Sequence, residues 1–478
     1  MNDKLDRREF LKISSATTLS VGTLTRAFNF GVATEEKPVR LGLIGVGDRG
    51  TDHVNLLLAM GGVEIPAICD INQDHLTRAQ SLVEKAGQKR PEGYGRDVED
   101  YQRLVYRDDL DAVLIATYWD WHTPMAVCAM KSGKYAAVEV PAALTVEDCW
   151  ELVNTYEGTG VPCMMLENWS FRRDNLAVLK MIRAGLFGEI VHSHCAHSHN
   201  CIDHWFFDPQ GNMRWGGEYL VKHNASQYTT HALGPVISWM DIGCGDYFDK
   251  VVSLANRSLG INHYFSTKFG PHHPNARRKY AQGDIVTTLV KTKKGNTIVI
   301  NYDMQLPRPY DNRWEIQGTE GLYNEQRKAV YLHGRSPKYE EWESFDPYQE
   351  KYDHPWWKSV EQESSAQRGS KSDTGNAIVR GHGGTDYHEL NQFLKAVRTK
   401  TQTPVDVYDS VIMSVINPLS EKSIAEGGAT VDCPDFTRGK WQTKKPSFGF
   451  ETQAVSEEPL RRAPRDPRCP RMTQSVPG

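Results

Sequence analysis

Residues 39–50 read Val-Arg-Leu-Gly-Leu-Ile-Gly-Val-Gly-Asp-Arg-Gly, an apolar run that ends in the glycine pattern G-x-G-x-x-G. Gly45 allows a tight turn, Gly47 lets backbone N–H groups approach a pyrophosphate, and Gly50 allows close packing of the next helix. Asp70 ends a second apolar stretch, where a carboxylate binds the ribose hydroxyls and repels the extra phosphate of NADP. The stretch therefore predicts a βαβ unit that binds NAD; the alternative is a glycine turn in an unrelated α/β protein.

The N-terminus carries a predicted export signal. Residues 6–12 read Asp-Arg-Arg-Glu-Phe-Leu-Lys, a twin-arginine pattern, and a weakly apolar stretch follows to about residue 33. Its many Ser and Thr residues and Arg26 make it a poor membrane span. We expect residues 1–33 to be a signal that exports a folded protein to the periplasm. A disordered basic N-terminus is the alternative, and both cleavage and retention as an anchor are compatible with the pattern.

Composition narrows the class of protein. A formal net charge of −4 with 24% charged residues gives no reason to expect a nucleic-acid partner. The nine cysteines include no C-x-x-C pair, so buried thiols such as Cys69 and Cys128 are expected, with one disulfide between Cys195 and Cys201 as an alternative. Twelve tryptophans and twenty tyrosines could supply the aromatic faces of a sugar-binding cleft.

Hydrophobic patterns divide the chain after the signal into two domains. Residues 38–168 alternate apolar strands with helical segments, which predicts an NAD-binding Rossmann domain with a doubly wound parallel sheet. Residues 169–445 are expected to form an α+β domain with a large, mostly antiparallel open sheet. Its strands are expected at 189–199, 249–255, 284–292, 297–302 and 313–318, and its later helices at 385–399 and 406–426.

Three further features of this second part are predicted. The last helices are expected to pack back on the Rossmann domain, and the open sheet face is considered as a surface for a homo-oligomer. Residues 360–380 are expected to be a polar loop, and residues 451–478, rich in Pro and Arg, a disordered tail.

Ligands of doubly wound folds bind at the carboxyl ends of the strands, so residues directly after each strand are site candidates. These are residues 118–124, 139–141 and 167–168, to which the second domain adds Arg214-Trp215, residues 227–235 and residues 307–310. Polar and aromatic groups from both parts are expected to converge on the nicotinamide.

A cluster of histidines raises the question of a metal. His192, His194, His197, His199 and His204 lie close in sequence, and alternate residues of a strand share a face. Histidines on an exposed sheet are common, and the cluster shows no set ligand spacing with a cysteine or carboxylate, so we expect no metal here.

The glycine turn, Ala116-Thr117 and Glu139-Val140-Pro141 resemble the glucose–fructose oxidoreductase/inositol dehydrogenase (Gfo/Idh/MocA) superfamily. In that superfamily the usual motif is E-K-P, whose lysine takes part in proton transfer, and an Asp commonly stands four residues before the catalytic His. This chain has Val140 and Gln227 at those positions. The departures argue against simple alcohol dehydrogenation.

A second set of motifs is similar to one branch, the NAD-dependent α-N-acetylgalactosaminidases of glycoside hydrolase family 109. The similarity spans about residues 38–445 and is carried by residues 119–122, 139–140, 165–168, 228–235, 307–310 and 381–386. Together with the glycine turn, it implies cofactor binding by Gly45, Gly47, Asp48, Arg49, Gly50, Asp70, Trp119, Asp120, Trp121, His122, Glu139, Val140 and Asn168. It implies substrate binding by Arg214, Tyr228, Thr229, Thr230, His231 and Tyr310, and acid–base catalysis by Tyr228 and His231.

The resemblance implies cleavage of a small glycoside or glycan terminus by transient oxidation at C3, elimination, addition of water and re-reduction with retained NAD. The proton acceptor is expected to be the His231 imidazole or the Tyr228 phenol. Phe171 stands where that branch commonly has a tyrosine, which raises the question of an altered proton path. The alternatives are an NAD-dependent sugar or polyol oxidoreductase of the same fold and a catalytically silent sugar- or nucleotide-binding protein.

Overall fold

The computed structural model describes residues 37–358 and 382–450. The predicted export signal, the polar loop at 360–380 and the predicted tail at 451–478 lie outside the described residues.

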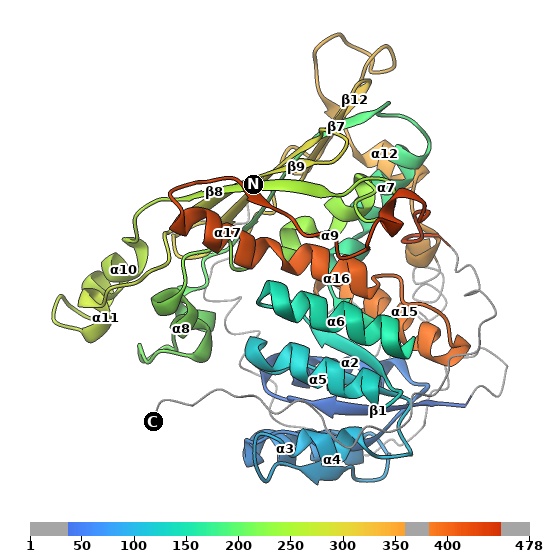
Figure 1. Ribbon diagram of the computed structural model, residues 1–478, viewed down its shortest axis with the longest axis vertical. Helices are drawn as coiled ribbons and strands as arrows, with labels where there is room; N and C mark the ends of the chain where they lie inside the picture. Colours follow the sequence, from blue (N-terminus) through green and yellow to red (C-terminus); the bar gives the residue numbers. More distant parts are fainter. Residues whose placement is uncertain (1–36, 359–381, 451–478) are drawn as a thin grey trace, which may run out of the picture. The chain divides into compact units, whose positions relative to one another are not determined.

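Six parallel strands form the first sheet, in the order β3-β2-β1-β4-β5-β6 (Figure 1). Strands β4 and β5 are buried along their whole length, as expected where helices cover both faces of a parallel sheet. The strands are β1 (Val39–Ile44), β2 (Val63–Cys69), β3 (Glu92–Tyr94), β4 (Ala112–Ile115), β5 (Tyr135–Glu139) and β6 (Cys163–Leu166). The helices of this part are α2 (Asp48–Met60), α3 (Gln73–Lys85), α4 (Tyr101–Val105), α5 (His122–Lys131) and α6 (Val146–Thr159).

Nine strands form the second sheet, in the order β14-β13-β12-β11-β7-β10-β9-β8-β15. All its pairs are antiparallel except β7 with β10, so the expected mostly antiparallel sheet is confirmed. Alternate residues of β9 are buried and exposed, which leaves one face open to solvent. The strands are β7 (Ile190–Ser198), β8 (Phe248–Ala255), β9 (Ile285–Thr292), β10 (Thr297–Asp303), β11 (Glu315–Gly318), β12 (Gly321–Asn324), β13 (Ala329–Leu332), β14 (Glu343–Ser344) and β15 (Val431–Asp432).

Helices complete the second part of the chain. Figure 1 shows α16 next to α6 and α17 beneath β8, and both pairs are in contact. Helix α15 contacts α2, β1 and β6, so segments more than 200 residues apart in sequence meet at the parallel sheet. The helices are α7 (Arg173–Arg183), α8 (Trp215–Lys222), α9 (Thr230–Trp239), α10 (Gly260–Lys268), α11 (Pro274–Arg277), α12 (Asp346–Lys351), α15 (Thr385–Thr399), α16 (Val407–Ser414) and α17 (Ile416–Ala425). Short helical turns are η1 (Trp119–Trp121), η2 (Asn168–Phe171), η3 (Ile202–Phe206), η4 (His382–Gly384) and η5 (Lys440–Gln442).

The single helix expected at 406–426 is wrong: the segment forms α16 and α17, separated at Val415. Pro418 has no amide to donate to the carbonyl of Ser414, four residues earlier, and lies in the first turn of α17, where a proline is tolerated. The helical periodicity therefore continues across a break in the helix.

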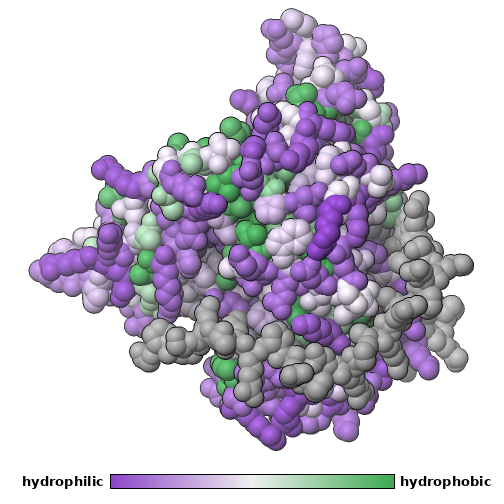
Figure 2. Space-filling model, viewed as in Figure 1, coloured by the Kyte–Doolittle hydropathy of each residue, from purple (hydrophilic) through white to green (hydrophobic). Residues whose placement is uncertain are grey.

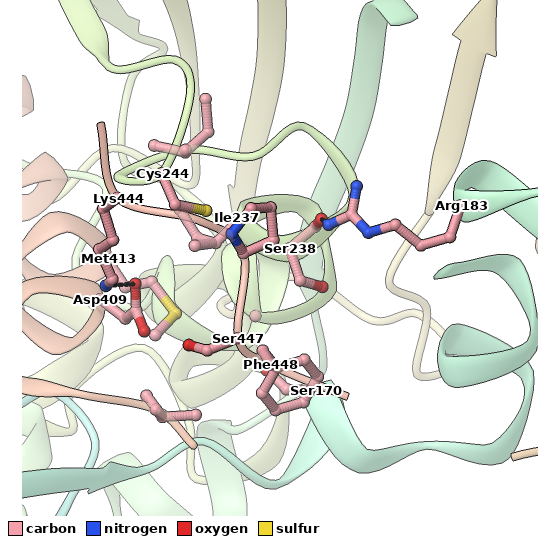
Figure 3. Close-up of a pocket in the computed structure, with 14 residues that line it drawn as sticks. Ser170, Arg183, Ile237, Ser238, Cys244, Asp409, Met413, Lys444, Ser447 and Phe448 are labelled. Atoms are coloured by element: carbon pink, nitrogen blue, oxygen red, sulfur yellow. Dashed lines mark hydrogen bonds and ion pairs between the residues drawn. The ribbon is translucent and has the colours of Figure 1, made fainter. Parts of the chain in front are cut away.

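The last described segment packs against the start of α16. Lys444 Nζ lies 2.6 Å from Asp406 Oδ2 and 3.9 Å from Asp409 Oδ1. Figure 3 shows Lys444 and Asp409 beside a small cavity that Cys244 and Phe448 also line. Its volume of about 30 Å³ is close to the share of one water molecule, so it is too small for a nucleotide or a sugar.

The structure tests the predictions about membrane-spanning segments and about the cysteines. In the part of the chain that the structure describes, the helices are too short or too polar to cross a membrane. The face in Figure 2 is mostly hydrophilic, with apolar side chains gathered near its centre. Cys69 and Cys128 are buried as expected, whereas the disulfide considered between Cys195 and Cys201 is not formed, and both are buried thiols.

Candidate active site

A cleft of about 1310 Å³ is lined by residues of both sheets and of the segments that follow their strands. This volume exceeds that of a typical pocket for one small ligand, and a dinucleotide together with a sugar needs such space. The cleft is lined by part of the predicted cofactor set and by most of the predicted substrate set: Gly45, Gly47, Asp48, Arg49, Asp70 and Trp121 from the cofactor set, and Arg214, Tyr228, His231 and Tyr310 from the substrate set.

The glycine turn has the geometry that its motif predicts. Gly45 has a φ of +82°, and a Cβ there would lie 2.5 Å from the carbonyl oxygen of Ala116. A Cβ at Gly50 would lie 2.0 Å from the carbonyl oxygen of Gly45, so α2 can pack on the turn only with glycine at this position. Gly47 precedes α2 without a side-chain cap among the described contacts, so free N–H groups of the first helical turn face the cleft.

Asp70 closes the ribose side of this turn. Its Oδ2 accepts a 2.8 Å hydrogen bond from the amide of Val46, and its Oδ1 accepts one of 2.8 Å from the amide of Asn72. His75 Nδ1 lies 3.7 Å from Asp70 Oδ2, and all of these residues except Val46 also line the cleft. Each carboxylate oxygen keeps a further lone pair, so Asp70 is held in place and still able to accept from ribose hydroxyls.

Arg49 connects the glycine turn to two buried acids. Its Nε lies 2.6 Å from Glu139 Oε1, and its Nη1 lies 2.7 Å from Asp386 Oδ2. Asp386 also accepts from Asn168 Nδ2 at 2.6 Å and lies 2.9 Å from His382 Nδ1. We call these five residues, Arg49, Glu139, Asn168, His382 and Asp386, the charged network.

Charge pairing keeps both acids of the network ionised. Burial alone would raise the pKa of Glu139, but the Arg49 charge and the hydrogen bond with His53 outweigh it and lower the pKa well below its usual range. The pKa of Asp386 is lowered in the same way, with burial opposed by Arg49 and His382. The nearby Glu389 is fully buried. Its burial, together with the charges of Asp386 and Glu139, raises the pKa of Glu389 well above its usual value, so this carboxyl group stays neutral.

Several residues of the predicted cofactor set lie behind the lining of the cleft. Glu139 and Asn168 are buried and hold Arg49 and Asp386, and the buried Val140 donates its amide to Glu139 Oε2 at 3.2 Å. His122 has its Nδ1 2.7 Å from the carbonyl oxygen of Pro141 and its Nε2 3.2 Å from that of Thr117. These residues position the strand ends instead of facing the cleft.

Trp119 and Asp120 belong to an aromatic wall. The Trp119 ring stacks on Tyr228 at 5.8 Å and also packs against Trp205 and Trp215, and it is buried. Asp120 accepts a hydrogen bond from the hydroxyl of Tyr219 on α8. The wall joins the end of β4 to α8 and holds the Tyr228 ring in place.

Glu167, His231 and Tyr228 form a hydrogen-bonded series, which we call the proton-transfer group. Glu167 Oε2 lies 2.6 Å from His231 Nδ1, and His231 Nε2 lies 3.3 Å from the Tyr228 hydroxyl. Glu167 Oε1 accepts from the amide of Trp169 at 2.9 Å, which fixes the carboxylate. With Nδ1–H donating to Glu167, Nε2 keeps its lone pair on the cleft side.

The Tyr228 phenol is held in its neutral form. Burial raises its pKa well above the usual value, and the nearby charges of Glu139 and Glu167 raise it further, with Arg49 only partly opposing them. The His197 ring, 4.8 Å from Tyr228 and 5.3 Å from His231, is buried, and burial lowers its pKa, so it is neutral as well. Of the two acid–base candidates, the raised pKa of Tyr228 favours proton donation by the phenol, which leaves His231 as the candidate acceptor.

Gly234 on α9 makes room for Glu167. A Cβ at this position would lie 2.8 Å from Glu167 Cγ and 2.8 Å from Ser170 Oγ. The G-P pair that the sequence shows three residues after His231 thus lets α9 pass close to the carboxylate that orients that histidine.

Of the predicted substrate residues not yet described, two line the cleft and two are buried behind it. Tyr310 lies in the cleft with its ring 5.0 Å from His199 and 5.8 Å from Trp169. Arg214 also lines the cleft, but its Nη2 pairs with Asp48 Oδ2 at 2.8 Å, on the side of the glycine turn. Thr229 and Thr230 are buried at the start of α9, and Thr229 Oγ1 donates to the carbonyl of Met413 at 3.4 Å.

Phe171 lies away from the cleft. Its buried ring stacks on Trp356 at 5.6 Å and packs edge-on against Phe448 at 5.2 Å. The Phe171 ring is therefore not part of the hydrogen-bonded series described above.

Sequence reasoning missed several residues of the site. The motifs that contain Glu167, His382 and Asp386 do not by themselves give these residues a role, and the signal for Glu167 is its place directly after β6. Cys201 was treated as a thiol or disulfide partner, yet it lines the cleft between His199 and His204. Burial and the neighbouring His204 and His231 lower the pKa of His199 to about 4.

Comparisons with known protein families decide between the interpretations. Residues 171–443 match the model described as "Glycosyl hydrolase 109, C-terminal domain", which covers more than half of the chain. The chain belongs to glycoside hydrolase family 109. Residues 39–167 match the model of the oxidoreductase family with an NAD-binding Rossmann fold, so this family 109 chain is a glycoside hydrolase with an NAD-binding domain.

Two relatives are similar in sequence to this family 109 chain over most of its length. It is 39% identical to "Alpha-N-acetylgalactosaminidase" of Tannerella forsythia, with 86% of this chain and 89% of the relative covered. It is 38% identical to a "Glycosyl hydrolase family 109 protein" of Stenotrophomonas maltophilia, with 94% and 99% covered.

Solved structures confirm the fold. Levoglucosan dehydrogenase in complex with NADH superposes with a TM-score of 0.60 at 19% identity, over 83% of this chain and 99% of that one. Myo-inositol dehydrogenase from Lactobacillus casei, in complex with NAD(H) and myo-inositol, gives 0.56 at 16% identity, over 83% and 97%. The glycine turn, the uncapped start of α2 and the placement of Asp70 fit an NAD molecule in the cleft of this chain.

Proposed function

We propose that this chain hydrolyses α-linked N-acetylgalactosaminides with an NAD molecule that it retains through each turnover. The observation that carries the proposal is the proton-transfer group in the same cleft as the glycine turn. The name of the Tannerella forsythia relative supports the choice of sugar.

The chemistry differs from the usual pair of carboxylates, and NAD-dependent glycosidases are recognised exceptions to that rule. Bound NAD supplies a reversible oxidation of the sugar at C3. A ketone at C3 acidifies the C2–H, so a base can take that proton while the C1–O bond breaks, and water then adds at C1. The residues of this chain have to bind the sugar, take the C2 proton and protonate the leaving oxygen.

His231 is the proposed base. Its Nδ1–H is engaged by Glu167, so its Nε2 lone pair is the accepting site, and the carboxylate stabilises the imidazolium that forms. Tyr228 donates a proton from a hydroxyl whose pKa is raised by burial, and it returns to the same state when His231 passes its proton on. This division gives one acceptor and one donor within 3.3 Å of each other.

The sugar contacts are proposed for the groups that line the cleft near this series. Tyr310 offers a ring face and a hydroxyl, and Arg214 offers donors for hydroxyl or N-acetyl oxygens. Thr229 and Thr230 are buried where α9, which carries His231, begins, and Thr229 anchors that end of the helix through the carbonyl of Met413.

A sugar or polyol oxidoreductase is the second candidate function. The fold is shared with dehydrogenases that were solved with NADH. Val140, buried at the position where the superfamily has its proton-transferring lysine, has no group to serve that reaction. Glycoside cleavage without net nucleotide turnover is therefore the favoured activity.

The test uses p-nitrophenyl α-N-acetylgalactosaminide, purified protein and no added nucleotide. We expect release of nitrophenol, and NAD recovered from the denatured protein at about one per chain. The matched substrate p-nitrophenyl α-galactoside, which lacks the N-acetyl group, is expected to react more slowly. Net NADH formation from free sugars, without cleavage of either glycoside, would instead establish the oxidoreductase.

The proposal includes export in folded form through residues 6–12 and a homo-oligomer through the open face of the second sheet. Export by the twin-arginine route suits a protein that must acquire NAD before it leaves the cytoplasm. When Arg7 and Arg8 are changed to Lys, we expect the protein to stay in the cytoplasm, so that the activity is found in the cytoplasmic fraction of the producing cells. Equal activity in the periplasmic fraction would contradict this part of the proposal.

A further inference from the structure

His199, Cys201 and His204 come together on the wall of the cleft. One ligand atom of each lies within 4.8 Å of the ligand atoms of the other two. These residues follow the end of β7 in the pattern H-x-C-x-x-H, and all three line the cleft. The proton-transfer group does not use them.

The backbone holds this group firmly. The amide of His199 donates to the carbonyl of Asp303 at 2.9 Å, and the amide of Cys201 donates to that of Met304 at 3.0 Å. The carbonyl of Cys201 in turn accepts from the amide of Phe206 at 3.1 Å, which closes the π-helical turn η3.

We propose that His199, Cys201 and His204 bind a divalent metal ion of intermediate softness, Zn²⁺, with its fourth coordination position open to the cleft. Two imidazole nitrogens and one thiolate suit Zn²⁺ and exclude Mg²⁺ and Ca²⁺, which need oxygen ligands. The sequence argument against a metal rested on the lack of a cysteine at ligand spacing, and the fold places Cys201 between the two histidines.

The distances allow such a site. Tetrahedral Zn²⁺ at about 2.1–2.3 Å from each ligand sets the ligand atoms about 3.3–3.8 Å apart. The ligand atoms therefore have to close by about 1 Å, and the His204 side chain, which is 51% exposed, is free to make that movement.

The charges around the group are balanced. Asp203 Oδ1 lies 3.8 Å from His204 Nδ1 and offers the carboxylate that commonly orients a metal-bound histidine. Arg214, which donates to the carbonyl of His204, is neutralised by Asp48 at 2.8 Å. Binding releases the proton of the Cys201 thiol as the sulfur–metal bond forms, so affinity should rise with pH.

The test adds Co²⁺ to the full-length protein after treatment with a chelator and removal of any affinity tag. Co²⁺ replaces Zn²⁺ in tetrahedral sites and reports thiolate ligation by a charge-transfer band. We expect one Co²⁺ per chain with that band, and displacement of Co²⁺ by Zn²⁺. Cys201→Ser should abolish the band, and His204→Ala, a change at an exposed side chain, should weaken binding by at least about tenfold.

Two variants serve as matched controls. Cys244→Ser removes a partly buried thiol beside the small cavity, and His194→Ala removes a histidine of β7 that binds Asn301. Both should keep the Co²⁺ spectrum of the unchanged protein. The absence of a charge-transfer band in the unchanged protein, or its persistence in Cys201→Ser, would overturn the proposal. Because no glycoside is present, neither result bears on the proposed hydrolase activity.

Discussion

The two sides of the cleft differ in how their polar groups are paired. In the charged network, Arg49 lies between two ionised acids, and the acids are held by further hydrogen bonds. In the proton-transfer group, the Tyr228 phenol is neutral and is linked to His231 by one hydrogen bond of 3.3 Å. Charges that are paired from several directions fix geometry, whereas a neutral donor and a single acceptor are free to exchange a proton.

The largest expected effect is at the proton acceptor. His231→Ala removes the proposed base, and kcat should fall by about 10²- to 10⁴-fold. The matched control is His192→Ala on β7, whose imidazole binds Thr297 Oγ1. Steady-state kinetics with the N-acetylgalactosaminide measures both. A His231→Ala variant with most of its activity would remove this histidine from the mechanism.

Breaking the charged network should cost stability. Asp386→Asn leaves the Arg49 guanidinium with one buried acid, and the free energy of unfolding should fall by about 3 kcal/mol. Asp48→Asn breaks an exposed pair with Arg214, for which a loss of less than about 1 kcal/mol is expected. Urea unfolding of the NAD-free proteins measures the difference. Equal losses in the two variants would show that burial does not distinguish these pairs.

Gly234→Ala tests the connection between helix packing and catalysis. The added methyl group meets Glu167 at 2.8 Å, so we expect a loss of about 1–3 kcal/mol and a fall in kcat as His231 loses its orienting partner. Gly158→Ala in α6 is the matched control, because a Cβ there meets open space and alanine favours the helix by up to about 1 kcal/mol. Thermal unfolding and kinetics of both variants are the measurements, and unchanged kcat in Gly234→Ala would contradict the packing argument.

Acidification should give the smallest effect. The folded-state pKa values of Glu139 and Asp386 lie below their ordinary values of 4.5 and 3.8. Their stabilising contribution is therefore complete above about pH 5 and is lost as the pH falls below the ordinary values toward the folded-state ones. Asp386→Asn should show a weaker loss of melting temperature than the unchanged protein between pH 5 and pH 3. An identical pH dependence of the two proteins would contradict the assignment.

Local patterns predicted the fold well. Side-chain periodicity can be read directly from the sequence. It predicts the strand before the glycine turn, the buried parallel strands and the alternating strands after residue 189. The helix break at Val415 and the short strands β12, β13 and β14 were not predicted. Strands of two to four residues carry too little periodicity to be recognised.

The site was predictable only in part. Residues that follow parallel strands were found because the topology places them at one edge of the sheet. Which of them face the cleft depends on partners far away in sequence. Asp386, 337 residues from Arg49, binds that side chain beside Glu139 and also accepts a hydrogen bond from Asn168. The role of Glu167 likewise depends on α9, which brings His231 within 2.6 Å of it.

Deuterium uptake tests the central claim, that a base in the cleft, proposed to be His231, takes the C2 proton of the sugar, most directly. The purified protein cleaves p-nitrophenyl α-N-acetylgalactosaminide in D₂O, and NMR of the released sugar measures the isotope at C2. We predict deuterium at C2 in the sugar released by the unchanged protein, because the proton on His231 exchanges with solvent before it returns. Sugar released at the normal rate with protium retained at C2 would contradict removal of that proton to a solvent-exchangeable base.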